Sequence, residues 1–234
     1  MKISIILLVM VLIWIGVSNS FIPGKVNFVG KQSYFTVVLD CGSTGTRVNA
    51  YEWLNNITSN QDLPTLLHSL PDHSTKNPLQ RNACRDHCMQ AEPALDSFLH
   101  NSSGIRAALE TLLLWAQQQI PSEKLGDTPL FLLATAGLRR LPNEDADWIL
   151  ENAETIIKEY PFLYTRSSIR VLNGKEEAYY GWVALNYKMG SLENSMKVPT
   201  LGVLDLGGSS LQVVMEIDES REDTHFFMSK LGSI

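Results

Sequence analysis

The stretch from Phe35 to Arg47 decides the fold and reads Phe-Thr-Val-Val-Leu-Asp-Cys-Gly-Ser-Thr-Gly-Thr-Arg. Its first five residues are apolar or β-branched, as in a buried strand, and Gly42 ends the run. Residues 48–53 then alternate like a second strand. The stretch therefore predicts a strand–turn–strand hairpin, with the carboxylate of Asp40 at the end of its first strand.

The same pattern returns 165 positions later, from Asp40 to Asp205. Residues 202–209 read Gly-Val-Leu-Asp-Leu-Gly-Gly-Ser, and 211–217 is predicted as the returning strand. A carboxylate at a strand end can hold a divalent cation through water, and glycines let backbone N–H groups approach phosphate oxygens. One such hairpin is equally well explained as an ordinary Gly-rich turn. Two facing copies predict a polyphosphate cradle with a metal ion between them.

Between the two hairpins, apolar runs of strand type alternate with helical patterns, which indicates an α/β architecture. The polar, proline-punctuated stretch from 55 to about 100 gives no assignment. The predicted elements are a helix capped by Ser103 with apolar positions 105, 108, 109, 112, 113 and 116, a strand over 129–134, a helix capped by Asn143 and stopped by Pro161, a strand over 169–172, a helix from Glu176 and a strand over 200–205.

The N-terminal residues 1–20 are predicted to be a signal peptide or a signal-anchor rather than part of the fold. Lys2 precedes an apolar run over 3–17, a little short for a spanning helix of about 20 residues. The sequons at Asn56 and Asn101 agree with entry into the secretory pathway. We therefore expect a membrane-anchored glycoprotein of the Golgi or cell surface, or an extracellular one if the segment is cleaved. The net charge of −6 gives no reason to expect nucleic-acid binding.

The three cysteines leave several alternatives open. Cys84 and Cys88 could pair with each other in an oxidising lumen, or either could bond to a cysteine elsewhere. His87 between them suggests a metal or haem site. Haem attachment, however, needs the histidine after the second cysteine, and zinc needs a fourth ligand. We favour a disulfide over a metal or haem site, and the partner of each cysteine stays open.

A hydrolase also needs a group that activates water. The segment 174–177, Gly-Lys-Glu-Glu, opens the predicted helix between the two hairpins, so one of its carboxylates could point into a cleft. Paired glutamates at a helix start more often only complement the helix dipole. Position alone therefore does not decide between the two roles.

Four segments, in order, closely resemble the first four of the five apyrase conserved regions of the ecto-nucleoside triphosphate diphosphohydrolase family, and residues 178–187 resemble plant membrane-type apyrases most. The resemblance implies two actin-like (RNase H-like) lobes with the nucleotide between them. The first lobe would be complete over 33–190, and the second only begun over 198–234. The four segments are 40–47, 134–139, 174–187 and 204–212.

The resemblance also implies a role for each matching residue. Water, activated by Glu177 as general base and placed by Ser210 and Gln212, would attack the terminal phosphorus of a nucleoside tri- or diphosphate. Asp40 and Asp205 would organise Ca²⁺ or Mg²⁺ through water. The phosphate-binding residues would be Gly42, Ser43, Thr44, Gly45, Thr46, Arg47, Thr135, Gly207, Gly208 and Ser209.

The sequence departs from the family at a few positions and leaves other functions open. Cys41 replaces a usual Ala, Lys175 a common Gln and Ala178 a common Gly, and none of these removes a proposed catalytic group. Since the second lobe would be only begun, we expect the 234-residue chain by itself to be poorly stable and inactive. The alternatives are an exopolyphosphatase-like hydrolase, a sugar kinase, and a catalytically dead nucleotide-binding or lectin-like fragment.

Overall fold

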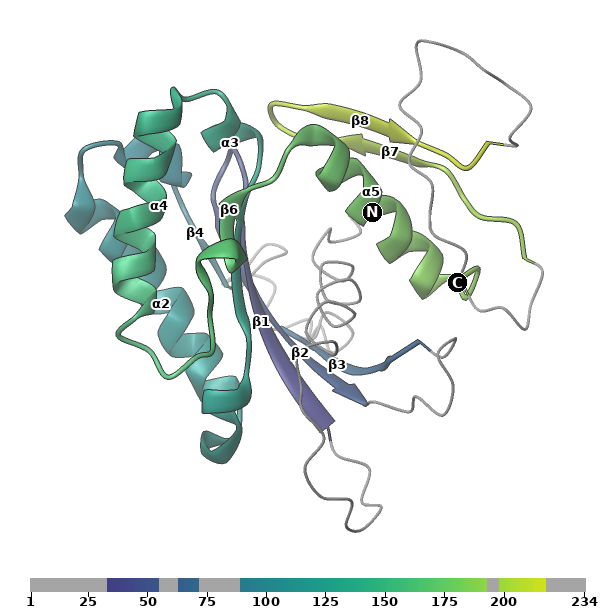
Figure 1. Ribbon diagram of the computed structural model, residues 1–234, viewed down its shortest axis with the longest axis horizontal. Helices are drawn as coiled ribbons and strands as arrows, with labels where there is room; N and C mark the ends of the chain where they lie inside the picture. Colours follow the sequence, from purple (N-terminus) through teal and green to yellow (C-terminus); the bar gives the residue numbers. More distant parts are fainter. Residues whose placement is uncertain (1–32, 55–62, 72–88, 193–197, 218–234) are drawn as a thin grey trace, which may run out of the picture.

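The computed structural model describes residues 33–54, 63–71, 89–192 and 198–217 (Figure 1). The predictions for residues 1–20, Asn56, Cys84 and Cys88 fall outside these ranges. No helix among the described residues has the length and hydropathy of a membrane span. In chain order the elements are β1 (Ser33–Cys41), β2 (Thr46–Leu54), β3 (Thr65–Leu70), β4 (Gln90–Ala91), η2 (Leu95–Phe98), α2 (Ser102–Gln119), η3 (Ser122–Asp127), β5 (Leu130–Ala134), α3 (Ala136–Arg139), α4 (Asn143–Ile157), η4 (Arg166–Ser168), β6 (Ile169–Val171), α5 (Gly174–Lys188), β7 (Val203–Leu206) and β8 (Leu211–Val214).

The main sheet has the order β3-β2-β1-β5-β6, with the two-residue β4 added against β2. β1, β2 and β3 form an antiparallel meander, whereas β5 joins β1 and β6 joins β5 in parallel. The parallel strands are reached through helical crossovers, as parallel pairing requires. The predicted α/β architecture is confirmed, and the first predicted hairpin lies at the centre of its sheet.

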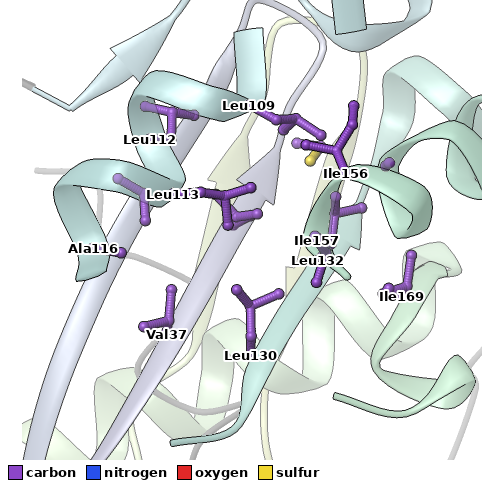
Figure 2. Close-up of a cluster of buried hydrophobic side chains, with 14 of the residues drawn as sticks. Val37, Leu109, Leu112, Leu113, Ala116, Leu130, Leu132, Ile156, Ile157 and Ile169 are labelled. Atoms are coloured by element: carbon purple, nitrogen blue, oxygen red, sulfur yellow. The ribbon is translucent and has the colours of Figure 1, made fainter. Parts of the chain in front are cut away.

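α2 and α4 cover one face of this sheet, and α5 lies on the side of the other face (Figure 1). Alternate residues of each strand point to these two sides. Val37 and Leu39 pack with α2 and α4 into the larger core, part of which Figure 2 shows. Val38, between them in the sequence, points to the other side and belongs to a second cluster with Phe131, which packs against tyrosines of α5. Asp40 has the same parity as Val38, so it lies on the face of the sheet that α5 covers.

The structure confirms the predicted helices, but their N-terminal caps are not the predicted residues. α2 buries all six apolar positions that the 3.6-residue pattern predicted. Its N-cap, however, is Asn101 rather than Ser103, because the Asn101 side chain accepts the Gly104 N–H at 3.0 Å. The cap of α4 is Pro142, not Asn143, and Pro142 makes no side-chain cap bond. α4 ends at Ile157, and a short turn precedes Pro161.

The second hairpin forms a separate two-stranded antiparallel ribbon, β7–β8, beside α5 (Figure 1). Val203 and Val214 pack on a small cluster built around Trp182 and Val183 of α5. Asp205 and Gln212 share the parity of these two valines and therefore also lie on the α5 side. α5 therefore lies between the main sheet and the ribbon (Figure 1). Asp40 is on the α5 side of the main sheet, and Asp205 and Gln212 are on the α5 side of the ribbon.

Candidate functional site

The two hairpins have the same turn. In the first, the Gly42 N–H donates to the Gly45 carbonyl at 3.0 Å. In the second, 165 positions later, the Gly207 N–H donates to the Ser210 carbonyl at 2.9 Å. The registers also correspond, because Asp40 faces Arg47 and Asp205 faces Gln212 across their strands. The repeat seen in the sequence is therefore a repeat of backbone structure.

The two turns touch each other at their tips. A Cβ atom added at Gly208 would lie 2.9 Å from the Ser43 hydroxyl oxygen and 3.2 Å from a methyl carbon of Thr44. Gly208 is the repeat equivalent of Ser43, so each turn presents the same position to the other. The two turns therefore meet through equivalent positions of the repeat. Thr44, Gly207 and Ser209 are exposed around this contact.

The residues after β5 support the first turn from beneath. The Thr135 N–H donates to the Cys41 carbonyl at 3.0 Å, and the Thr135 carbonyl accepts the Arg139 N–H at 3.2 Å as α3 begins. A Cβ atom at Gly137 would lie 3.4 Å from the Cα atom of Ser43. Thr135 and Gly137 therefore lie against the first turn. Thr135 itself is buried.

The two glutamates at the start of α5 do different things. Asn173 and Glu176 form a capping box: the Asn173 side chain accepts the Glu176 N–H at 2.9 Å, and Glu176 accepts the Asn173 N–H at 3.0 Å. Glu176 also accepts a bond from Arg170 at 2.7 Å. Glu177 has no part in the cap and is 6% exposed. Glu176 thus serves the helix start, whereas the Glu177 carboxylate takes no part in it.

Glu177 is held by one residue from each part of the molecule. Its Oε2 atom accepts a 2.5 Å bond from Arg139 Nη1 and a 3.1 Å bond from Gln212 Nε2. The same Arg139 nitrogen donates to the Leu172 carbonyl, and Gln212 Nε2 also donates to the Ser210 hydroxyl at 3.1 Å. The structure therefore brings together all three predicted catalytic residues. It adds Arg139, to which the sequence analysis assigned no role although its motif was recognised.

The side-chain oxygen of Gln212, Oε1, is buried without a hydrogen-bond partner among the described residues. Buried amide oxygens in folded proteins almost always accept a hydrogen bond. Gln212 also contacts Ser210 and Glu177. The amide oxygen, the Ser210 hydroxyl and the Glu177 carboxylate could therefore all accept hydrogen bonds from a small molecule bound among them. A water molecule has the size and the two donor hydrogens that such a site suits.

Arg47 contacts the carboxylate of Asp40, with Nη1 and Oδ2 3.6 Å apart. Arg47 Nε donates to Gln90 of β4 at 3.1 Å, which fixes the guanidinium over the turn. A Cβ atom at Gly42 would lie 3.8 Å from Arg47 Nη1, so the cation is close to the backbone of the turn. The cationic end of Arg47 therefore lies beside the backbone of the first turn and the Asp40 carboxylate.

Cys41 and Thr46 form the strand pair next to the first turn, and both are fully buried. Burial, with a smaller contribution from the Asp40 charge, raises the pKa of the Cys41 thiol, although the Thr46 hydroxyl opposes this. The thiol is therefore neutral and packs as a small apolar group. The Thr46 side chain is buried, whereas Ser43 is half-buried and Thr44 is exposed.

No three His, Cys, Asp or Glu side chains among the described residues are grouped as a metal cage. The carboxylates that the sequence proposes for a cation are the two repeat-equivalent aspartates, Asp40 and Asp205, one at the end of each facing hairpin strand. Mg²⁺ in particular keeps several waters and is often held by one or two carboxylates plus substrate phosphates. The donor set therefore fits a hydrated oxygen-ligated cation and does not fit zinc, which prefers nitrogen and sulfur.

Known proteins share this sequence pattern. The model of the GDA1/CD39 (nucleoside phosphatase) family matches residues 28–230. The chain belongs to this family. It is 40% identical to probable apyrase 7 of Arabidopsis thaliana over 89% of its own length and 28% of that relative, and 34% identical to the Golgi apyrase of Schizosaccharomyces pombe over 80% of its own length and 32% of that relative.

The apyrase-type resemblance is thus confirmed, and family membership together with the observed α/β lobe confirms the actin-like fold class. The chain spans about a third or less of the length of these two GDA1/CD39 relatives. Among solved structures, a nucleoside triphosphate hydrolase of Neospora caninum covers 77% of this chain and 35% of its own, at 18% identity and a TM-score of 0.45.

Proposed function

We propose that this chain carries the water-activating part of a site that hydrolyses nucleoside tri- and diphosphates. The observation that carries the proposal is the contact of Glu177 with Gln212. It joins the buried carboxylate of one α5 residue to the second hairpin, next to the Ser210 hydroxyl. A general base must lie within hydrogen-bond reach of the water that it deprotonates. The unpartnered oxygen of Gln212 supplies an acceptor for the other hydrogen of that water.

In the proposed reaction, Glu177 takes a proton from the water held by Ser210 and Gln212. The water oxygen forms a bond to the terminal phosphorus, and the bond from that phosphorus to the bridging oxygen breaks. The leaving group is the nucleoside di- or monophosphate, which carries the electron pair away. Arg139 keeps the Glu177 carboxylate aimed at the second hairpin through its 2.5 Å bond.

The phosphates would be held by the two turns. Gly207 would close the second turn, and the backbone N–H groups of the exposed residues Gly208 and Ser209 would bind from that side. Those around Ser43 and Thr44 would bind from the other. Gly42 and Gly45 would keep the first turn tight, and Thr135 and Thr46 would support it. Arg47 would place positive charge beside the terminal phosphate. The two turns touch at their tips, so a polyphosphate would have to part them or bind along their rim.

Ca²⁺ or Mg²⁺ would be held through water by Asp40 and Asp205. When bound, such a cation neutralises negative charge on the phosphate oxygens. The nucleotide is the proposed partner, and we expect no nucleic acid to bind.

We also propose the domain arrangement in which residues 33–190 form a first lobe and residues from 198 onward belong to a second. Three things support it: the separate β7–β8 ribbon, the repeat, and the longer GDA1/CD39 relatives. A secretory location, with anchoring at the Golgi or cell surface or release from the cell, is proposed from the apolar segment 3–17, with a Golgi apyrase among the relatives.

The test is phosphate release from ATP and ADP with Ca²⁺ or Mg²⁺ present. It uses the chain itself and a chimera in which residues 28–230 replace the matching segment of probable apyrase 7. Glu177→Gln should lower release about 10²- to 10⁴-fold, the usual contribution of a general base. Glu176→Gln is the matched control and should leave release within a few-fold, because Glu176 contacts Asn173 and Arg170 and neither hairpin. Release from the chimera that Glu177→Gln leaves unchanged would contradict the proposal. Faster release from inorganic polyphosphate would point instead to an exopolyphosphatase.

A further inference from the structure

The sequon Asn101-Ser102-Ser103 lies at the start of α2 and has no part in the proposed hydrolysis. All three of its residues are exposed. No proline separates the asparagine from the hydroxyl residue, as attachment of a glycan requires. The sequon therefore lies on the surface of the folded lobe.

The Asn101 carboxamide uses its oxygen within the fold. Oδ1 accepts the Gly104 N–H at 3.0 Å and the Ser103 hydroxyl at 2.9 Å. The described part of the chain contains no hydrogen bond from Nδ2 to accompany these two. A Cβ atom at position 104 would lie 2.8 Å from Asn101 Nδ2 and 2.3 Å from a ring carbon of Phe98. The glycine at 104 therefore makes room for the carboxamide to fold over the first turn of α2.

We propose that Asn101 carries an N-linked glycan and that the same side chain caps α2. The donor is a lipid-pyrophosphate-linked oligosaccharide of the secretory lumen. A bond forms between Nδ2 and the anomeric carbon, and the bond from that carbon to the pyrophosphate oxygen breaks. The lipid pyrophosphate leaves with the electron pair, and a base of the transferase takes the amide proton. The N-glycosidic product keeps its carbonyl oxygen, so Oδ1 remains an acceptor for the Gly104 N–H.

The proposal does not depend on hydrolysis, so its test needs no activity. The full chain is expressed in a eukaryotic secretory host, and its electrophoretic mobility is compared before and after treatment with an N-glycosidase. The peptide that contains residue 101 is then analysed by mass spectrometry, since enzymatic release of the glycan leaves Asp in place of Asn. We expect a mobility shift and an Asp at position 101 in the treated chain.

Three variants separate the glycan from the cap. Ser103→Ala removes the sequon and leaves Oδ1 free to cap, so the shift assigned to position 101 should disappear. Ser103→Thr keeps the sequon and should restore it. Ser102→Ala, the matched control at the neighbouring exposed serine, should leave the shift unchanged. Asn56→Gln identifies any glycan at the other sequon.

The proposal is overturned if the chain shows no N-glycosidase-sensitive shift. It is also overturned if Asn56→Gln abolishes the whole shift, or if Ser103→Ala leaves Asn101 converted to Asp. Far-UV circular dichroism of Ser103→Ala shows whether α2 still forms. A lost shift with unchanged helix content supports the proposal and excludes misfolding as its cause.

Discussion

The two hairpins share their turn and register, yet differ completely in burial. Leu39 in β1 and Leu204 in β7 are the same residue at equivalent positions, and their side chains are 0% and 62% exposed. β1 lies between two strands and packs one face on α2 and α4 and the other against tyrosines of α5. Within the described ranges β7 pairs only with β8, and it packs one face on α5. Local sequence therefore determines the turn and the pairing, and the surroundings determine how much each strand contributes to stability.

The outer face of the β7–β8 ribbon shows the consequence. Leu204 faces Val213 and Leu206 faces Leu211 across the two strands, and all four side chains are at least 59% exposed. Met215 continues the same apolar surface. The opposite face carries Asp205 and Gln212. The ribbon thus presents its chemical groups to α5, although its other face adds nothing to the described core.

The largest difference in stability between the two hairpins should appear when their equivalent leucines are replaced. Leu39→Ala leaves a cavity in a fully packed core and should lower the free energy of unfolding by about 2–5 kcal/mol. Leu204→Ala should change it by less than about 0.5 kcal/mol, because that side chain is mostly in water already. Urea denaturation of the full chain measures both. Equal losses would mean that the outer face of β7 is covered in solution.

The turn glycines should give the next largest difference. A Cβ atom at Gly45 would lie 2.7 Å from the Ala91 carbonyl, so Gly45→Ala must displace β4 and should cost about 1–3 kcal/mol of stability. The equivalent position in the second hairpin already carries a side chain, Ser210. Gly126→Ala is the control, because nothing lies within 4 Å of its Cβ position. A Gly45→Ala chain as stable as the Gly126→Ala chain would show that β4 does not restrain the first turn.

The sequence predicted the hairpins, the alternation of strands and helices, and the buried stripe of α2, since each follows from a short local pattern. It failed at helix caps, because Asn101 and Ser103 both can cap and only the fold decides between them. It could not predict that Arg139 contacts Glu177, because the two residues are 38 positions apart on different helices. β3 and β4 were missed because their stretch is polar and rich in proline, so packing rather than local pattern places them.

The residues opposite the two aspartates offer a third, smaller test. Arg47 pairs with Asp40, whereas the equivalent Gln212 contacts Glu177 instead. Arg47→Gln makes the first hairpin like the second and should lower stability by about 1 kcal/mol, since the Arg47 and Asp40 side chains are only 21% and 18% exposed. Added salt should shrink this loss.

The control for that substitution is Arg140→Gln. Arg140 lies 3.7 Å from Asp96, a similar distance, but its side chain is 60% exposed. We expect a smaller loss there, because exposed ion pairs contribute little in water. Thermal denaturation at low and high salt compares the two variants. A larger loss for Arg140→Gln would mean that the Arg47 pair does not stabilise the first hairpin.

The smallest effect should come from the contact between the two turns. A methyl group at Gly208 would meet the Ser43 hydroxyl at 2.9 Å, and that side chain can rotate away, so Gly208→Ala alone should cost less than about 1 kcal/mol. In a Ser43→Gly background only the 3.2 Å contact with the Thr44 methyl carbon remains, and the same substitution should cost less. The two changes should therefore couple by about 0.5 kcal/mol or more, whereas distant sites add within about 0.3–0.5 kcal/mol. Denaturant unfolding of the four chains of this cycle measures the coupling. Additive losses would mean that the tips part in solution and that the two hairpins, alike in backbone, do not meet without a ligand between them.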